Sequence, residues 1–117
     1  MSLYYVLLCA VVMQAQRDAY HIHSRWLLVS AAGSGSSWHV DPWNTSAWNS
    51  LLRGRKRWAL YPPTVSGLPL GASASSPAEF FGRVLPALPL GERPLQCVLE
   101  EGDTIFLPSG WWHGMSI

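Results

Sequence analysis

The chain has 117 residues, enough to bury a core and fold as a single domain. Eight lysines and arginines stand against seven acidic residues, so the basic surplus of a dedicated nucleic-acid binder is absent. Two cysteines, Cys9 and Cys97, are too few for a disulfide framework or a cysteine zinc site, and free thiols in a reducing compartment are expected.

The first element is an apolar run at residues 3–13. It is shorter than the roughly twenty residues that span a bilayer. No positive charge precedes it, and Met13 stands where a signal-peptide cleavage site requires a small residue. We interpret this segment as a buried strand, or as the product of a misassigned first exon, rather than as a secretion signal.

From Arg25 the pattern becomes regular. A turn rich in glycine and serine is predicted at residues 33–36, Pro42 should end the strand that follows it, and Arg53-Gly54 is the predicted turn of an antiparallel hairpin. Apolar and β-branched content predicts strands at residues 25–29, 38–41, 47–52 and 56–61.

Residues 64–94 are rich in Pro, Gly, Ser and Ala, which indicates a surface insertion. Within it, residues 77–85 are predicted to be helical, because Pro77 occupies the first turn and apolar residues recur at spacings of three and four. Two further strands, residues 95–99 and 104–107, are predicted on either side of a turn at Glu101-Gly102-Asp103.

His39 and Asp41 have the most informative spacing in the chain. Residues two apart on an extended strand project from the same face, so the imidazole and the carboxylate can converge while Val40 turns away. His113, which follows a Pro-Ser-Gly turn and two tryptophans, would add a second imidazole. Two histidines and one carboxylate are the ligand set that holds Fe(II) with open positions in non-haem oxygenases.

Each of these residues also has a structural interpretation. A His-x-Asp spacing arises by chance, and a histidine beside aromatic residues, such as His113, is often a core residue. Lys56 lies in a basic run, residues 53–57, which alone is typical of a solvated turn. Six of the seven tryptophans lie near these motifs, and we interpret most of them as core residues.

Two runs of sequence carry a family resemblance: SSWHVDPWNTSAWNSLLRGRKRWALYPP at residues 36–63 and EEGDTIFLPSGWWHG at residues 100–114. They closely resemble the JmjC domain of the Fe(II)- and 2-oxoglutarate-dependent dioxygenases. Within that superfamily they look most like the branch of the bifunctional arginine demethylase and lysyl hydroxylase. The resemblance covers residues 25–114.

The resemblance implies roles for five residues. His39, Asp41 and His113 fall on the iron ligands of the family. Lys56 falls on the lysine that pairs with the distal carboxylate of 2-oxoglutarate, and Asn49 on an asparagine of the same pocket. The chemistry agrees, because a desolvated dicarboxylate needs a cation at its far end and an amide adds hydrogen bonds without charge.

The predicted hairpin would place Asn49 and Lys56 on the same face. The resemblance implies that Lys56 points inward, while Arg55 and Arg57 stay on the outer face.

The implied fold is mainly all-β: a double-stranded β-helix of the jelly-roll or cupin type, with one short helix in an insertion. Such a barrel needs about eight strands, and in the family further strands follow the one that carries the third ligand. Because this chain ends at Ile117, we expect a barrel truncated at its C-terminus. Residues 1–24 would be a poorly matching segment and residues 25–117 a partial JmjC domain.

The implied function is an Fe(II)- and 2-oxoglutarate-dependent oxygenase that hydroxylates or N-demethylates lysyl or methyl-arginyl side chains of proteins, histones or splicing proteins among them. Two alternatives stay open: an inactive fragment that serves as a binding module, and a cupin that binds another metal, such as zinc, without oxygenase activity. The expected partner is a protein substrate, and no nucleic acid or membrane is indicated. The resemblance implies a nuclear location, with the cytoplasm as the alternative.

Overall fold

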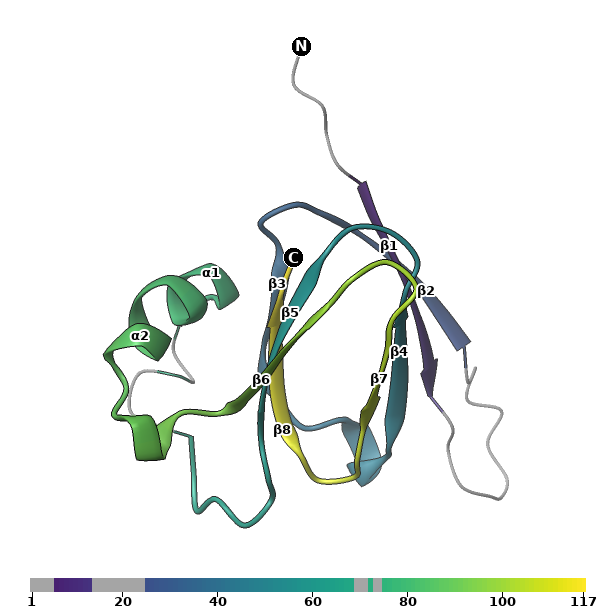
Figure 1. The fold of residues 1–117 in the computed structure, drawn as a ribbon. Coiled ribbons are helices and arrows are strands. Elements are labelled where there is room, and N and C mark those ends of the chain that lie inside the picture. Colours follow the sequence, from purple (N-terminus) through teal and green to yellow (C-terminus); the bar gives the residue numbers. More distant parts are fainter. Residues whose placement is uncertain (1–5, 14–24, 69–71, 73–74) are drawn as a thin grey trace.

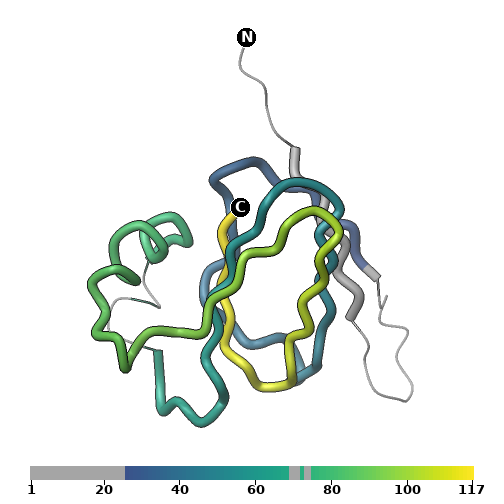
Figure 2. Tube along the Cα trace, in the orientation of Figure 1, coloured from purple at the N-terminus to yellow at the C-terminus, as the bar shows by residue number. Residues whose placement is uncertain are grey.

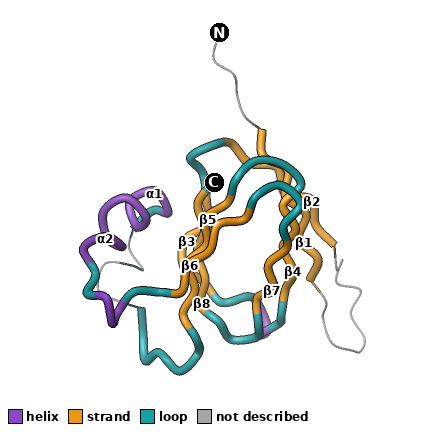
Figure 3. The backbone as a smooth tube through the Cα atoms, in the orientation of Figure 1, coloured by secondary structure: helices purple, strands orange, loops and turns teal. Residues whose placement is uncertain are grey.

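The computed structural model describes residues 6–13, 25–68, 72 and 75–117. Within these residues, eight strands form two four-stranded antiparallel sheets that face each other, and short helices lie to one side (Figures 1 and 3). The strands are β1 (Val6–Met13), β2 (Arg25–Ala31), β3 (Gly35–His39), β4 (Ala47–Leu51), β5 (Lys56–Tyr61), β6 (Leu95–Leu99), β7 (Thr104–Leu107) and β8 (Trp112–Ser116).

The first sheet has the strand order β2-β1-β4-β7, and the second sheet has the order β3-β8-β5-β6. Only the connections β1–β2 and β5–β6 stay within one sheet, and every other connection between consecutive strands crosses to the facing sheet (Figure 2). Repeated crossing of this kind produces a double-stranded β-helix of the jelly-roll type. The all-β fold expected from the sequence is confirmed.

The predicted hairpin between residues 47–52 and 56–61, which form β4 and β5, is wrong. β4 hydrogen-bonds to β1 and β7, whereas β5 hydrogen-bonds to β6 and β8. The turn itself exists, and Gly54 adopts a φ of 96° there, a value that favours glycine. Because both strands have an apolar face to bury, the turn forms an arch that lays β4 and β5 against each other in opposite sheets.

The main core fills the space between the two sheets. Leu51 and Leu107 from the first sheet meet Trp58, Leu60 and Met115 from the second. Alternate residues of β4, beginning at Ala47, are buried, as expected for a strand with one face toward the core. These inward-facing residues form the apolar surroundings of the polar candidate site.

The helices cover the outer face of the second sheet. α1 (Pro77–Glu79), the π-helical turn η2 (Phe80–Val84) and α2 (Leu85–Ala87) form one continuous helical run. Ser76 caps its start by accepting a hydrogen bond from the backbone N–H of Glu79. Phe80, Phe81 and Leu85 pack over Ala59 of β5. The predicted helix at residues 77–85 is confirmed and extends to residue 87. Two short 3-10 turns, η1 (Pro42–Asn44) and η3 (Leu90–Glu92), complete the described elements.

β3 differs from its prediction. It begins at Gly35, inside the expected turn, and ends at His39, so Asp41 lies beyond the strand. The turn is instead at Ala32-Gly33, where Gly33 has a φ of 82°. The other strands predicted after residue 25 agree with the structure to within two residues at each end.

The N-terminal segment contributes a strand to the fold. β1 lies between β2 and β4 in the first sheet, so a strand is confirmed at the apolar run. The division of the chain after residue 24 and the truncation at the C-terminus stay predictions. Across the described residues, no helix is both long and apolar enough to cross a membrane.

Neighbouring leucines test the buried interface between the sheets. Leu51 is fully buried in the core, whereas Leu52 is about half exposed. We expect Leu51→Ala to lower the free energy of unfolding by about 2–5 kcal/mol, because it leaves a cavity between the sheets. Leu52→Ala should change it by about 0.5 kcal/mol or less. Urea unfolding followed by circular dichroism measures both, and equal losses would contradict this description of the core.

Candidate metal centre

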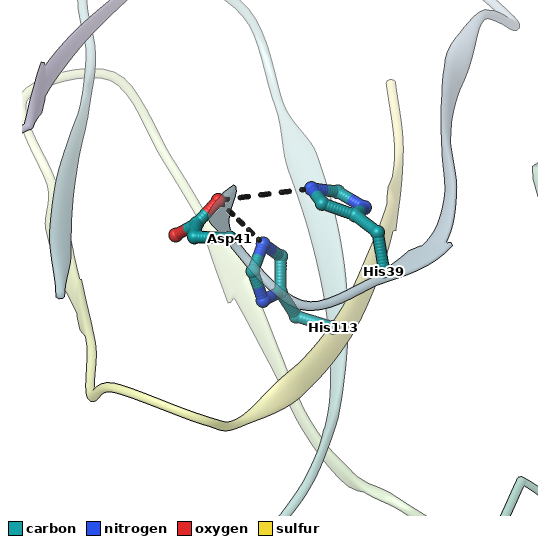
Figure 4. A group of neighbouring side chains, drawn as sticks. All are labelled: His39, Asp41 and His113. Carbon is teal, nitrogen blue, oxygen red and sulfur yellow. Dashed lines mark ion pairs between the residues drawn. The ribbon is translucent and has the colours of Figure 1, made fainter. Parts of the chain in front are cut away.

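Three side chains meet at one end of the space between the sheets. His39 ends β3 and lies directly opposite His113 of β8, and their ring centroids are 4.3 Å apart. Asp41 follows β3 by two residues, and its Oδ1 lies 3.9 Å from Nε2 of His39 and 3.6 Å from Nε2 of His113 (Figure 4). Ligand atoms of all three residues lie within 4.8 Å of one another. The structure therefore brings together the predicted ligand set.

A bulge in β3 puts His39 in this position. Gly35 and Ser36 pair with Ser116 and Met115, and the register then shifts before His39 pairs with His113. Continued without the bulge, the first register would place His39 opposite Trp112. The bulge explains why Ser36 and His39, three residues apart, both line the interior.

The backbone fixes the orientation of both imidazoles. Nδ1 of His39 lies 2.7 Å from the carbonyl oxygen of Ser37, and Nδ1 of His113 lies 3.1 Å from that of Trp111. A carbonyl oxygen only accepts, so each Nδ1 is assigned the proton and each Nε2 keeps its lone pair. Both lone-pair nitrogens lie near Asp41. This is the arrangement by which proteins orient histidine ligands toward a metal.

Burial keeps His113 neutral. Desolvation lowers the pKa of His113 below its usual value, and the neighbouring His39 lowers it further, against the opposing effects of the Trp111 carbonyl and Asp41. A neutral imidazole can donate its lone pair to a cation. Two imidazole lone pairs and a carboxylate oxygen close together form a donor set that fits a divalent metal ion, Fe(II) among them.

The three residues open onto a cavity of about 460 Å³ that also contains Asn49 and Lys56. Lys56 is only 1% exposed, and its Nζ donates to Oδ1 of Asn49 at 3.3 Å. The ammonium also lies 4.6 Å from the ring centroid of Trp58. Asn49 comes from β4 and Lys56 from β5, so the two residues meet across the sandwich rather than along a hairpin.

The basic residues at 55–57 point to different sides, as the resemblance implied. Lys56 points inward, whereas Arg55 and Arg57 are exposed. The Arg55 side chain forms an ion pair with Glu100 at 2.8 Å, and Arg57 donates to Gln96 at the same distance. Lys56 is the first residue of β5, and the next residue, Arg57, projects outward as the strand period requires.

The tryptophans do not all serve as core residues. Trp58 is buried between the sheets, and Trp38 packs against Tyr61 and Phe80 on the helix side. In contrast, Trp43 is 79% exposed. Trp43 and Trp26 both line the cavity of the candidate site, a location that sequence reasoning missed because an exposed indole has no sequence signature.

Comparison with known proteins agrees with this architecture. The model of a family described as "Cupin-like domain" matches residues 7–116. The chain belongs to the cupin-like domain family. The match extends over both sheets, from the beginning of β1 to the end of β8.

Curated relatives of this cupin-like domain are JmjC proteins. It is 46% identical over 102 residues to "Lysine-specific demethylase JMJ21" of Arabidopsis thaliana, covering 76% of this chain and 11% of the relative. It is 40% identical over 101 residues to "Bifunctional arginine demethylase and lysyl-hydroxylase psr-1" of Caenorhabditis elegans, covering 76% of this chain and 25% of the relative. The resemblance to JmjC domains is confirmed. The chain spans about a tenth to a quarter of the length of these two relatives.

Metal titration tests the candidate centre. We expect Co(II), followed by its visible absorption, to bind the cupin-like domain at one site. His39→Ala or Asp41→Ala removes a ligand and should weaken binding by more than the roughly 10- to 100-fold lost with an outer-shell partner. Glu101→Gln is the matched control, because it removes an exposed carboxylate from a distant turn. Unchanged Co(II) affinity in both ligand variants would show that the metal binds elsewhere.

Proposed function

We propose that this cupin-like domain is the catalytic domain of an Fe(II)- and 2-oxoglutarate-dependent oxygenase that acts on protein side chains. One observation carries the proposal: the cavity that holds the His39, Asp41 and His113 cluster also holds a buried lysine, Lys56, paired with Asn49. A metal-binding cupin without a co-substrate has no use for a buried cation at this place.

His39, Asp41 and His113 would hold the iron. When bound, iron and 2-oxoglutarate together supply the oxidant for a strong C–H bond, and the protein supplies positions and charges. Asp41 contributes the single negative charge of the donor set. The hydrogen bonds from the two Nδ1 atoms to backbone carbonyls keep the imidazoles turned toward the metal position.

Lys56 would pair with the distal carboxylate of 2-oxoglutarate. Burying an ammonium group costs solvation free energy, and a buried carboxylate partner with good hydrogen bonds offsets that cost. Asn49 holds the Lys56 ammonium through Oδ1 and has amide donors of its own for a carboxylate. The pair can therefore orient a dicarboxylate whose other end reaches the metal.

Apart from Ser36, the rest of the cavity wall is apolar. Ala47, Leu107, Met115 and Trp58 are among the residues that line it. Side chains of this kind keep water away from the bound co-substrate and strengthen the ion pair to Lys56.

The names of the relatives support a proposal for the substrate class. The printed names of the relatives describe lysine and arginine demethylases and a lysyl-hydroxylase. Hydroxylation of a methyl group on nitrogen ends in demethylation, whereas hydroxylation of a chain carbon leaves a stable alcohol. We propose a lysyl or methyl-arginyl side chain of a protein such as a histone as the substrate, and the nucleus as its location.

Lys56→Met tests the co-substrate role. The anaerobic cupin-like domain with Fe(II) should develop a visible charge-transfer band on addition of 2-oxoglutarate. We expect Lys56→Met to raise the 2-oxoglutarate concentration needed for half of the band by about thirtyfold or more, because losing one partner of a buried charge pair costs about 2–5 kcal/mol.

Two variants serve as controls for that titration. Arg55→Met removes a neighbouring exposed cation and should leave the midpoint unchanged, and His39→Ala should abolish the band. Co(II) binding without any 2-oxoglutarate band in the wild-type chain would instead support a metal-binding cupin without oxygenase activity. Failure to bind either would support an inactive binding module.

A further inference from the structure

The loop after Asp41 has a strained backbone. Trp43 has φ and ψ of 52° and 23°, and the next residue, Asn44, has a φ of 56°. A bulky residue such as Trp rarely adopts this left-handed region, where it costs of order 1–3 kcal/mol, whereas Asn tolerates it better. Among the described residues, these two are the only non-glycine positions with positive φ.

Packing does not explain the strain. Trp43 is 79% exposed, so its large apolar side chain buries little surface in the position that the strained backbone gives it. An indole held in water next to a metal-ligand residue gains nothing for the stability of the isolated chain. Strain without compensating burial is typical of functional sites.

Hydrogen bonds hold the strained loop in place. The Ser109 hydroxyl donates to the carbonyl of Asn44 at 2.5 Å, and the Ser109 N–H donates to the hydroxyl of Ser46 at 3.0 Å. The Thr45 hydroxyl closes the turn by donating to the carbonyl of Pro42. Ser109 lies in the loop that precedes β8, the strand of His113. Its hydrogen bonds therefore connect the loop that carries Trp43, which follows β3, to the loop before β8.

Trp43 stands at the entrance of the cavity. It lines the cavity together with Pro42 and with Trp26 of β2, which is itself 51% exposed. Both indoles are therefore accessible from solvent and from the cavity. The electron-rich face of an indole is the strongest side-chain partner for a cation, and guanidinium groups also stack on it.

Among the described residues that line the cavity, the charged groups do not select for a cation. The positive charges of Fe(II) and Lys56 balance the negative charges of Asp41 and 2-oxoglutarate. A loaded site therefore has no net charge with which to attract a cationic side chain. Preference for a cation has to come from groups at the entrance.

We propose that Trp43, together with Trp26, is the specificity-determining contact for the substrate, and that its indole takes a cationic, weakly hydrated side-chain group such as a methylated guanidinium. This inference rests on the proposed oxygenase function and adds to it the residues that recognise the substrate. The strained loop presents the indole in advance, which lowers the entropy cost of binding.

Calorimetry with two matched peptides tests the proposal. One peptide carries N-methylarginine, and the other carries N-methylcitrulline, which has nearly the same shape without the charge. With Mn(II) and 2-oxoglutarate present, the wild-type chain should bind the methylarginine peptide about three- to thirtyfold more tightly, the range of cation–π contacts. Trp43→Ala should bring this ratio close to one, and Trp43→Phe should retain part of it.

Trp48→Ala is the matched control. Trp48 is also exposed, at 44%, but it packs against Phe106 and is not among the residues that line the cavity. Its removal should leave the ratio unchanged. Equal binding of the two peptides by the wild-type chain, no binding of either, or equal loss in the Trp48 and Trp43 variants would each overturn the proposal.

The charge-transfer band of the Fe(II) and 2-oxoglutarate complex separates this inference from the proposed function. Trp43→Ala should keep the band, which shows that the loop still holds Asp41 in place while peptide discrimination is lost. A band lost in Trp43→Ala would assign Trp43 a structural role and overturn the recognition role. A wild-type chain without a band would contradict the proposed function, whatever the peptides show.

Discussion

The pairing of β3 with β8 is the contact on which the candidate site depends. It places His39 and His113 side by side through a one-residue bulge, and Asp41 then reaches both imidazoles from the chain that leaves β3. The pairing requires glycine at position 35, where an added Cβ would lie 2.2 Å from the carbonyl oxygen of Met115 and 2.7 Å from Pro77. The same glycine therefore lets β3 approach β8 and lets the helical run begin against it.

The second constraint is that both sheets must bury an apolar face. Because of this requirement, the β4–β5 connection is an arch between the sheets rather than a hairpin. The arch brings Asn49 and Lys56 together from opposite sheets. The arch yields a cavity lined by the metal-ligand cluster, by the buried Lys56 and by apolar side chains. Polar groups are expensive to bury in such surroundings, and the proposed divalent metal ion and 2-oxoglutarate carboxylate would help to offset that cost.

The two loops at the metal end act as a unit. Ser109 ties the loop that precedes β8 to the loop that follows β3, and Gly110 packs close to Asn44 with a φ of 77°. Asp41, which no strand holds, owes its position to this connection. The connection also supports the strained backbone at Trp43, so the arrangement that positions a candidate ligand also presents an indole to the solvent at the cavity entrance.

The sequence by itself determined most of the strands and the helix, and the family resemblance identified the residues that meet in the candidate site. Apolar and β-branched content and turn residues predict most strand ends, and the family resemblance implies the inward direction of Lys56. The local sequence pattern did not predict the bulge in β3, the arch in place of a hairpin, or the exposure of Trp43. Each of these depends on which distant strand lies alongside, and pairing across the chain is decided by packing two apolar faces together rather than by neighbours in sequence. Only the tertiary structure therefore decided that His39 opposes His113 and that Asn49 meets Lys56 across the core.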